Sequence, residues 1–251
     1  EHGYGSSPVI HETLLIALGD NLAGSFIAAV DRTTGDLVWR TARETSGRHG
    51  SYATPVVAYV AGRNQLLVSG MSGVSSYNPL TGDLLWSCQG PAEVTANTIA
   101  SSESLIFASG GYPEKELLAI RADGEGDVSE SHVVWRSRKG IAYVPSPIYR
   151  DGRLYVMSDD GIASWFDATS GRVLRRRRIG GNFSASPIMA GGFLYVPDEA
   201  GTTIVIKADE SLEVIARNDL GDGGYASAAI CGNHIYLRTL HSLYSIRASA
   251  E

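Results

Sequence analysis

The sequence predicts an all-β protein, organised as a β-propeller of four-stranded blades. The first observation behind this prediction is a phrase that recurs along the chain. Asp31-Arg-Thr-Thr-Gly35-Asp-Leu-Val-Trp39 returns as Asn78-Pro-Leu-Thr-Gly82-Asp-Leu-Leu-Trp86. Asp167-Ala-Thr-Ser-Gly171 is a third copy without the Trp, and a copy with an insertion runs from Asp123 to Trp135. Self-similarity at a period of about 40 to 50 residues is typical of solenoids, propellers and arrays.

The second observation is a marker that keeps step with the phrase. The pairs Ser7-Pro8, Thr54-Pro55, Ser146-Pro147 and Ser186-Pro187 each precede a short apolar stretch, and Asn97-Thr98 and Ser227-Ala228 occupy the same place in two further copies. These six markers have a mean spacing of about 44 residues. We therefore expect one domain over residues 1–251, with repeats at about 5–43, 51–90, 94–140, 142–181, 183–222 and 225–251.

The third observation is that each copy divides into four short strands. In the fourth copy the expected strands are 147–149, 154–158, 162–167 and 172–176, separated by turns rich in Asp and Gly. Short runs of Val, Ile, Leu and Tyr between such turns indicate strands and hairpins. No stretch shows convincing helical periodicity, so helix should be scarce. A four-stranded unit repeated six times predicts a propeller.

Eight positions of the repeat have expected structural roles. An Asp before the turn can bond its own backbone, and a Gly can adopt the positive φ that closes the turn. A Trp on the outermost strand can cover the seam between two blades, burying roughly 150–250 Å². These positions are Asp31, Gly35, Trp39, Gly82, Trp86, Trp135, Asp167 and Gly171.

The phrase at residues 29–39, Ala-x-Asp-x-x-Thr-Gly-x-x-x-Trp, resembles the repeat of the pyrroloquinoline-quinone (PQQ) propeller superfamily. In that family the Trp docks against the neighbouring blade. Trp39 and Trp86 are not followed by Asp, as a WD40 repeat requires. The resemblance covers nearly the whole chain, and it implies an all-β propeller for all six copies.

The composition of the chain argues against some classes of function. A net charge of −6 and a pI near 5.5 argue against general nucleic-acid binding. There is no run of 18 apolar residues, so we expect no membrane span. We also expect a monomer. The chain begins at Glu1 without Met, and its last copy lacks a fourth strand. We expect it to be a fragment of a seven- or eight-bladed ring, with one or two blades upstream.

Enzymes with this repeat are PQQ-dependent alcohol or sugar dehydrogenases. The resemblance associates the alcohol-oxidising members with two adjacent cysteines, a bound calcium ion and an Asp base. This chain has only Cys88 and Cys231, which we expect to be two buried free thiols. The acidic pairs Asp159-Asp160 and Asp198-Glu199 offer oxygen ligands for a hard cation, but turn formation also explains them. We therefore expect no catalytic, cofactor-binding or metal-binding residues and no Ser/His/Asp triad.

Arg175-Arg-Arg-Arg178 is the one run of like charge. It falls on an expected outer strand, where exposed charge blocks edge-to-edge pairing. The alternative is a docking patch for an acidic partner, because rows of arginine suit carboxylate or phosphate recognition.

Aromatic residues recur three or four positions ahead of the markers, near the expected mouth of the ring. They are Tyr4, Tyr52, Tyr143, Phe183 and Tyr225, and Lys139 lies in one of the connecting loops. They either pack between blades or form a collar that binds a peptide or small ligand, as aromatic and Arg side chains do at binding hot spots. The candidate binding residues are Arg48, His49, Tyr52, Asn97, Tyr143, Asn182 and Tyr225.

The resemblance implies a non-catalytic propeller that binds proteins or ligands at the cell envelope, without a cofactor. It is similar to the lipoprotein propellers that scaffold outer-membrane protein assembly, which places it in the periplasm with a protein or peptide partner. The first alternative is a PQQ- and calcium-dependent alcohol or sugar dehydrogenase whose cofactor residues lie in missing sequence. The second is an extracellular sensor domain joined to further sequence upstream.

Overall fold

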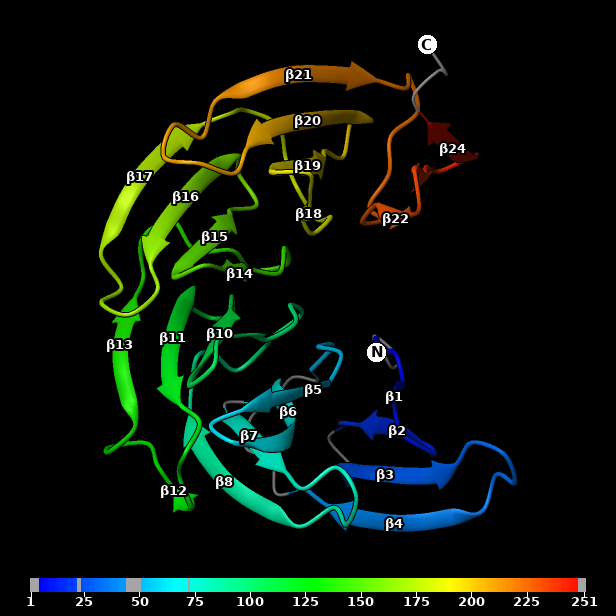
Figure 1. Ribbon diagram of the computed structural model, residues 1–251, viewed down its shortest axis with the longest axis vertical. Coiled ribbons are helices and arrows are strands. Elements are labelled where there is room, and N and C mark those ends of the chain that lie inside the picture. The colour runs from blue at the N-terminus through cyan, green and yellow to red at the C-terminus, as the bar shows by residue number, and fades with distance from the viewer. Residues whose placement is uncertain (1–4, 22–23, 44–50, 72, 248–251) are drawn as a thin grey trace.

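The computed structural model describes residues 5–21, 24–43, 51–71 and 73–247. Within those ranges it contains 24 strands and no helix. The strands form six sheets that follow one another along an open arc (Figure 1). The predicted all-β propeller fold is therefore confirmed.

The first, fourth and fifth sheets are antiparallel meanders of four strands in chain order. The first sheet consists of β1 (Val9–His11), β2 (Leu14–Gly19), β3 (Phe26–Asp31) and β4 (Leu37–Ala42). The fourth consists of β14 (Ile148–Arg150), β15 (Arg153–Met157), β16 (Ile162–Asp167) and β17 (Val173–Arg178). The fifth consists of β18 (Ile188–Ala190), β19 (Phe193–Pro197), β20 (Thr202–Lys207) and β21 (Val214–Asp219).

The remaining three sheets vary this plan. The third consists of β9 (Ala100–Ser101), β10 (Leu105–Gly110), β11 (Glu116–Arg121) and β13 (Val133–Ser137). The sixth has three strands, β22 (Ala229–Cys231), β23 (His234–Arg238) and β24 (Leu243–Arg247). The second consists of β5 (Val56–Val60), β6 (Arg63–Gly70), β7 (Gly73–Tyr77) and β8 (Leu84–Gln89), with β12 (Gly126–Asp127) as a fifth strand.

Strand β12 comes from the insertion between β11 and β13, yet it joins the preceding sheet. It runs parallel to β8, with Gly126 opposite Trp86. The backbone N–H of Val128 donates to the Ser87 carbonyl at 2.8 Å, which fixes the end of the insertion on the same strand. The insertion thus links the second and third sheets along their outer edge.

The turns between third and fourth strands follow the repeated phrase. The Asp31 carboxylate accepts backbone N–H bonds from Thr33 and Thr34, at 2.7 and 3.0 Å. Gly35 has a φ of +80°, a conformation that costs glycine little. Asp167 accepts an N–H bond from Ser170 at 2.8 Å in the same way.

The core lies between the sheets rather than inside one of them. Each of its four main clusters joins residues of two consecutive sheets. The clusters include Trp39 at the seam of the first and second sheets, Trp86 at the next seam and Trp135 at the one after. All three indoles are buried.

The Ser/Thr-Pro markers also join neighbouring sheets. The backbone N–H of one marker donates to the hydroxyl of the next marker along the arc, at distances of 2.8 to 3.0 Å. These bonds run from Ser7 to Thr54, Thr98 to Ser146, Ser146 to Ser186, and Ser186 to Ser227. The markers therefore supply one backbone-to-hydroxyl bond at four of the five junctions between consecutive sheets.

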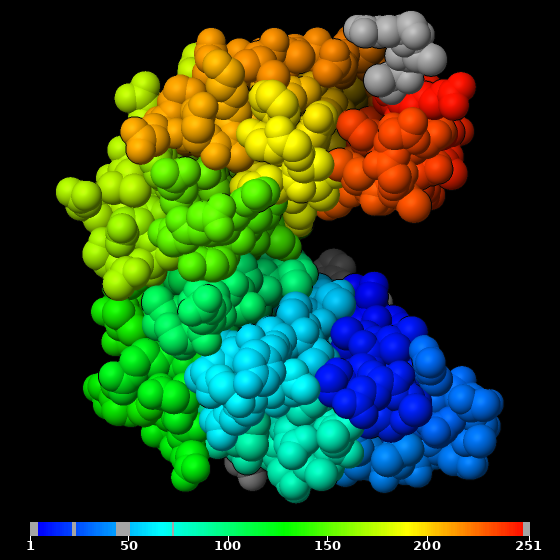
Figure 2. Space-filling view, in the orientation of Figure 1, coloured from blue at the N-terminus to red at the C-terminus, as the bar shows by residue number. Residues whose placement is uncertain are grey.

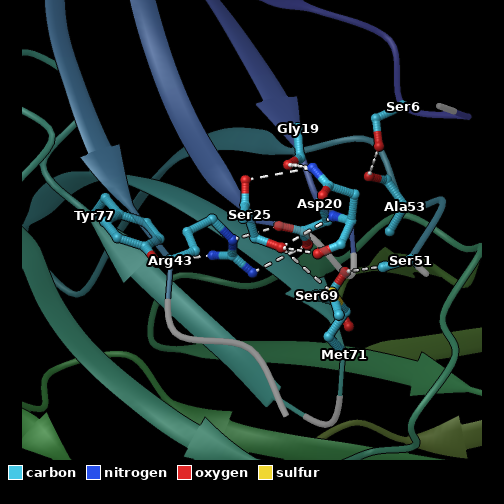
Figure 3. Close-up of polar contacts among 12 residues, drawn as sticks. Ser6, Gly19, Asp20, Ser25, Arg43, Ser51, Ala53, Ser69, Met71 and Tyr77 are labelled. Atoms are coloured by element: carbon cyan, nitrogen blue, oxygen red, sulfur yellow. Dashed lines mark hydrogen bonds and ion pairs between the residues drawn. The ribbon is translucent and has the colours of Figure 1, made fainter. Parts of the chain in front are cut away.

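A buried ion pair of the first sheet also contacts the second sheet. Arg43 Nε lies 2.8 Å from Asp20 Oδ1, and both side chains are almost fully buried. Arg43 Nη1 also donates to the Tyr77 hydroxyl of the second sheet at 2.8 Å (Figure 3). Burial is the largest single influence and lowers the pKa of Arg43, but Asp20 and Tyr77 together outweigh it, so the pKa of Arg43 is raised.

The two ends of the arc stand apart, with open space between the first and sixth sheets (Figure 2). Cys88 is buried, but Cys231 is exposed, so the expectation of two buried thiols is wrong for Cys231. The reason is its position: β22 belongs to the last sheet of the arc, and no other described sheet packs on the far side of that sheet. No helix in the described ranges has the length and apolar character needed to cross a membrane.

Candidate binding site at the mouth of the arc

Asp159, in the turn between β15 and β16, organises the loops at one end of the strands. Its carboxylate accepts the backbone N–H groups of Tyr143 and Val144, at 2.8 and 3.0 Å. Its Oδ2 also lies 2.6 Å from the ammonium of Lys115, in the turn between β10 and β11. One carboxylate therefore holds together the third and fourth sheets at the mouth.

Tyr143, whose backbone Asp159 holds, lies near Tyr52 and Tyr112, and we call these three residues the tyrosine cluster. Burial, followed by the nearby Tyr52, Asp159 and Tyr112, raises the pKa of Tyr143. Tyr112 is 46% exposed, while Tyr52 and Tyr143 are half-buried. Each ring thus combines an apolar face with a phenol that donates and accepts hydrogen bonds.

The backbone beneath the cluster explains how three different sheets present it. The N–H of Tyr52 donates to the Thr95 carbonyl at 2.9 Å, and Val94 forms an isolated bridge with Tyr112. Gly111 packs against the Tyr143 ring so closely that a methyl group there would overlap it. Glycine at this position allows the ring to lie on the backbone of the third sheet.

Asn97 supports the site from below. It is 1% exposed, and its Nδ2 donates to the Tyr143 carbonyl at 3.3 Å. Its Oδ1 is buried without a hydrogen-bond partner among the described residues. Asn97 therefore joins the third and fourth sheets instead of presenting its amide at the surface.

The other predicted mouth residues do not join the tyrosine cluster. Phe183 is 1% exposed and packs in the core between the fourth and fifth sheets, whereas Tyr225 is 62% exposed on the loop before β22. The aromatic positions therefore differ in burial and do not form one uniform collar. Asn182 is exposed, and its carbonyl accepts the N–H of Glu199 at 2.9 Å. Tyr4, Arg48 and His49 lie outside the described residues.

The carboxylates of the acidic pairs accept hydrogen bonds from their own turns and from neighbouring loops. Asp160 accepts the Ser158 hydroxyl at 2.6 Å, and this bond is the main cause that lowers the pKa of Asp160. In the second pair, Asp198 accepts the Thr202 N–H at 2.8 Å, and Glu199 accepts the Ser184 hydroxyl at 2.6 Å. The described ranges contain no group of three or more His, Cys, Asp or Glu side chains placed to hold a metal. The carboxylates of both acidic pairs are thus engaged in structural hydrogen bonds.

One contact in the insertion could not be predicted from the sequence. Ser131 Oγ lies 2.7 Å from His132 Nδ1, and His132 Nε2 lies 3.5 Å from Asp123 Oδ1. Asp123 also lies 3.6 Å from Arg121, and its side chain is mostly exposed. The contact borders a groove of about 510 Å³ at the opposite ends of the strands from Asp159. Ser131 and His132 are consecutive residues of one turn, so their hydrogen bond is local and does not by itself make a nucleophile.

The repeat turns, the Trp seams and the six sheets along an arc define a β-propeller protein of the PQQ-like repeat class. The family model described as outer membrane protein assembly factor BamB matches residues 4–148 and 127–214. The chain belongs to this family.

Solved structures share the fold at low sequence identity. BamB from Moraxella catarrhalis is 12% identical with a TM-score of 0.52, and the match covers 93% of this chain and 81% of that one. The computationally designed Ika8 protein is 13% identical with a TM-score of 0.67, covering 92% and 66%. The quinohemoprotein alcohol dehydrogenase ADHIIG from Pseudomonas putida HK5 is 13% identical with a TM-score of 0.65, covering 87% and 42%. No curated protein sequence is significantly similar to the chain.

Proposed function

We propose that this chain is a non-catalytic propeller that binds a protein or peptide partner at the mouth of the arc. The observation that carries the proposal is the tyrosine cluster, whose backbone is held at each member. Asp159 holds Tyr143, the Thr95 carbonyl holds Tyr52, and a bridge to Val94 holds Tyr112. Membership of a family described as an outer-membrane protein assembly factor supports a protein partner and a scaffolding role at the cell envelope, in the periplasm.

The side chains of the tyrosine cluster are of a type that binds the surface of another protein. Tyrosine is enriched at binding hot spots, because its ring contributes contact area and its hydroxyl a hydrogen bond. Ordering side chains on binding costs free energy. This cost is smaller for a cluster whose backbone is already anchored before binding. The ion pair between Lys115 and Asp159 adds a polar border beside the rings.

Site-specific photocrosslinking tests the proposal. A benzoylphenylalanine at position 112 is expected to crosslink a defined partner in the envelope of cells that produce the complete protein. Tyr59 provides the matched control, because it is an exposed tyrosine on β5, away from the cluster. Equal crosslinking at both positions, or none at position 112, contradicts a partner site at the mouth. Fractionation of the same cells checks the periplasmic location.

The second candidate function is a PQQ- and calcium-dependent alcohol or sugar dehydrogenase. The observation in its favour is the likeness to ADHIIG, which concerns the fold alone and covers 42% of that enzyme. Titration of the complete protein with PQQ and calcium, followed by a dye-linked oxidation assay with alcohols and sugars, separates the two candidates. Saturable PQQ binding together with turnover favours the enzyme, and a flat titration favours the scaffold.

A further inference from the structure

Strand β17 presents the most concentrated positive charge of the chain along a free sheet edge. It is the outermost strand of the fourth sheet and pairs on one side only, with β16. All six of its residues are exposed, and four of them are Arg175 to Arg178. The strand lies on the outside of the arc, far from its open side (Figure 1).

None of these arginines forms a salt bridge with a carboxylate of the described residues, although the charge of Arg178 helps to lower the pKa of Asp160. Arg176, Arg177 and Arg178 each donate to a backbone carbonyl. The acceptors are Lys139 at 2.9 Å, Leu212 at 3.3 Å and Asp160 at 3.2 Å, in the same order. A guanidinium has five N–H donors, so most of them remain available. The chain as a whole has a net charge of −6, so these four adjacent arginines form a local positive patch on an acidic protein.

The spacing of the arginines determines which spacing of acidic residues a partner segment needs. Alternate residues of a strand lie on the same side, about 6.6 to 6.8 Å apart. Arg175 and Arg177 therefore match acidic residues at every second position of another extended segment, as do Arg176 and Arg178. Arginine binds carboxylates in a bidentate geometry that a flexible lysine does not reproduce.

The protein itself shows that an outer edge of this kind accepts another strand. On the second sheet, β12 pairs with β8, the strand that corresponds to β17. Gln89 of β8 also receives a side-chain contact from this segment, because its N–H donates to the Ser129 hydroxyl at 2.9 Å. The edge of β17 has no such covering strand among the described residues.

We propose that β17 binds an acidic, extended segment of a partner protein, which adds to the fourth sheet as a fifth strand. The backbone edge supplies the hydrogen bonds, and the arginines select carboxylates at alternate positions. The same arginines prevent the β17 edges of two copies of the chain from pairing with each other, because like charges repel. The residues that prevent edge-to-edge association are therefore also those that recognise the partner. This surface is separate from the mouth and does not depend on the function proposed for it.

A labelled peptide tests the proposal directly. The probe is a fluorescein-labelled peptide in which Glu alternates with Thr over about eight residues, the length of a strand. Fluorescence anisotropy with the whole chain is expected to show saturable binding that weakens as salt increases. The variant R175Q/R176Q/R177Q/R178Q is expected to lose about ten-fold or more in affinity, a change that needs only about 1.4 kcal/mol. Circular dichroism checks that this variant keeps its strands.

Two controls separate strand addition from general attraction of anions. The variant R32Q/R150Q/R238Q/R247Q removes the same charge from exposed positions elsewhere, and it is expected to bind like the unchanged chain. A peptide with the same charges but N-methylated at every Thr and every Glu cannot donate along either edge, and it is expected to bind at least about ten-fold more weakly. Absence of binding, equal losses in both Arg variants, or full binding of the methylated peptide each overturns the proposal. The last result instead identifies β17 as a general polyanion surface.

Discussion

The indole of Trp39 lies directly over Gly82 of the next sheet, so that a methyl group on Gly82 would overlap the ring. The Thr41 hydroxyl, on the same strand as Trp39, donates to the Gly82 carbonyl at 2.7 Å. Trp135 and Gly171 repeat the arrangement two seams further along. The glycine of the repeated turn therefore has two roles, because it adopts positive φ and also receives the Trp of the preceding sheet.

Gly82→Ala and Gly35→Ala separate these two roles. Both glycines have a φ near +80°, but nothing lies within 4 Å of a Cβ at Gly35. Backbone strain should cost both variants about 1 kcal/mol or more. G82A is expected to lose a further 1–3 kcal/mol or so, roughly the cost of overpacking a close contact. Urea unfolding followed by Trp fluorescence measures the difference, and equal losses in the two variants contradict the docking role.

Removing Trp39 should also destabilise the protein strongly. The side chain is buried in the cluster between the first and second sheets. Trp39→Ala is expected to cost about 3–5 kcal/mol, the usual range for deleting a large buried aromatic residue. The neighbouring Val38→Ala is the control, since Val38 is exposed and should change the free energy of unfolding by about 0.5 kcal/mol or less. A loss for W39A no larger than that of V38A contradicts the packing role of the indole.

Arg43→Met tests the buried ion pair with Asp20. The variant leaves a carboxylate buried without its counter-ion, which typically costs about 3–5 kcal/mol. Adding Asp20→Asn to Arg43→Met should recover part of this loss, because the uncompensated charge is gone. Arg40→Met is the control on β4, the strand that ends directly before Arg43; its guanidinium is exposed above the Phe26 ring and contributes about 0.5–1 kcal/mol. If the double variant is no more stable than R43M, the penalty does not come from the unpaired charge.

The repeat turns predict a loss of stability in acid. Hydrogen bonds to the carboxylates lower the pKa values of Asp31, Asp167 and Asp209 below the usual value of about 3.8, through Thr34, Ser170 and Ser211 respectively. A lowered folded-state pKa contributes stability above the unfolded value, and this contribution is lost as the pH falls through the folded value. Stability should therefore decrease below about pH 4.

Asparagine substitutions provide the test of this acid effect. Asn78 already occupies the equivalent position in the second copy and accepts the Leu80 N–H at 2.9 Å. The variant D31N/D167N/D209N should therefore fold at neutral pH. Its free energy of unfolding should change less between about pH 6 and pH 3 than that of the unchanged chain. An unchanged pH dependence contradicts the assignment of the acid loss to these turns.

Much of the fold could be predicted from the sequence, because its signals are local and repeated. The third strand expected in the fourth copy, 162–167, coincides with β16, since an Asp-Gly turn and a Thr-Ser-Gly turn delimit it. The remaining strands of that copy differ by one or two residues at their ends. The number of blades in the complete ring stays a prediction.

The contacts that build the site were less predictable, because they depend on how consecutive sheets meet. Lys115 and Asp159 are 44 residues apart and belong to different sheets, so no spacing within one repeat indicates their ion pair. Tyr112 was missed because it precedes no marker, although it completes the tyrosine cluster. Strand β12 has only two residues, too few for a periodic pattern, and its partner β8 belongs to the preceding copy.

The two cysteines should differ sharply in reactivity, since their surroundings differ. Burial raises the pKa of Cys88 to about 11, and the thiolate is the form that reacts. Cys231 is exposed on β22. Ellman's reagent at about pH 8 should label one thiol per native chain, and Cys231→Ser should abolish this labelling until the protein is unfolded. Cys88→Ser is the matched control and should leave the native labelling unchanged. Rapid labelling of both thiols in the native chain contradicts the burial of Cys88 at the seam between the second and third sheets.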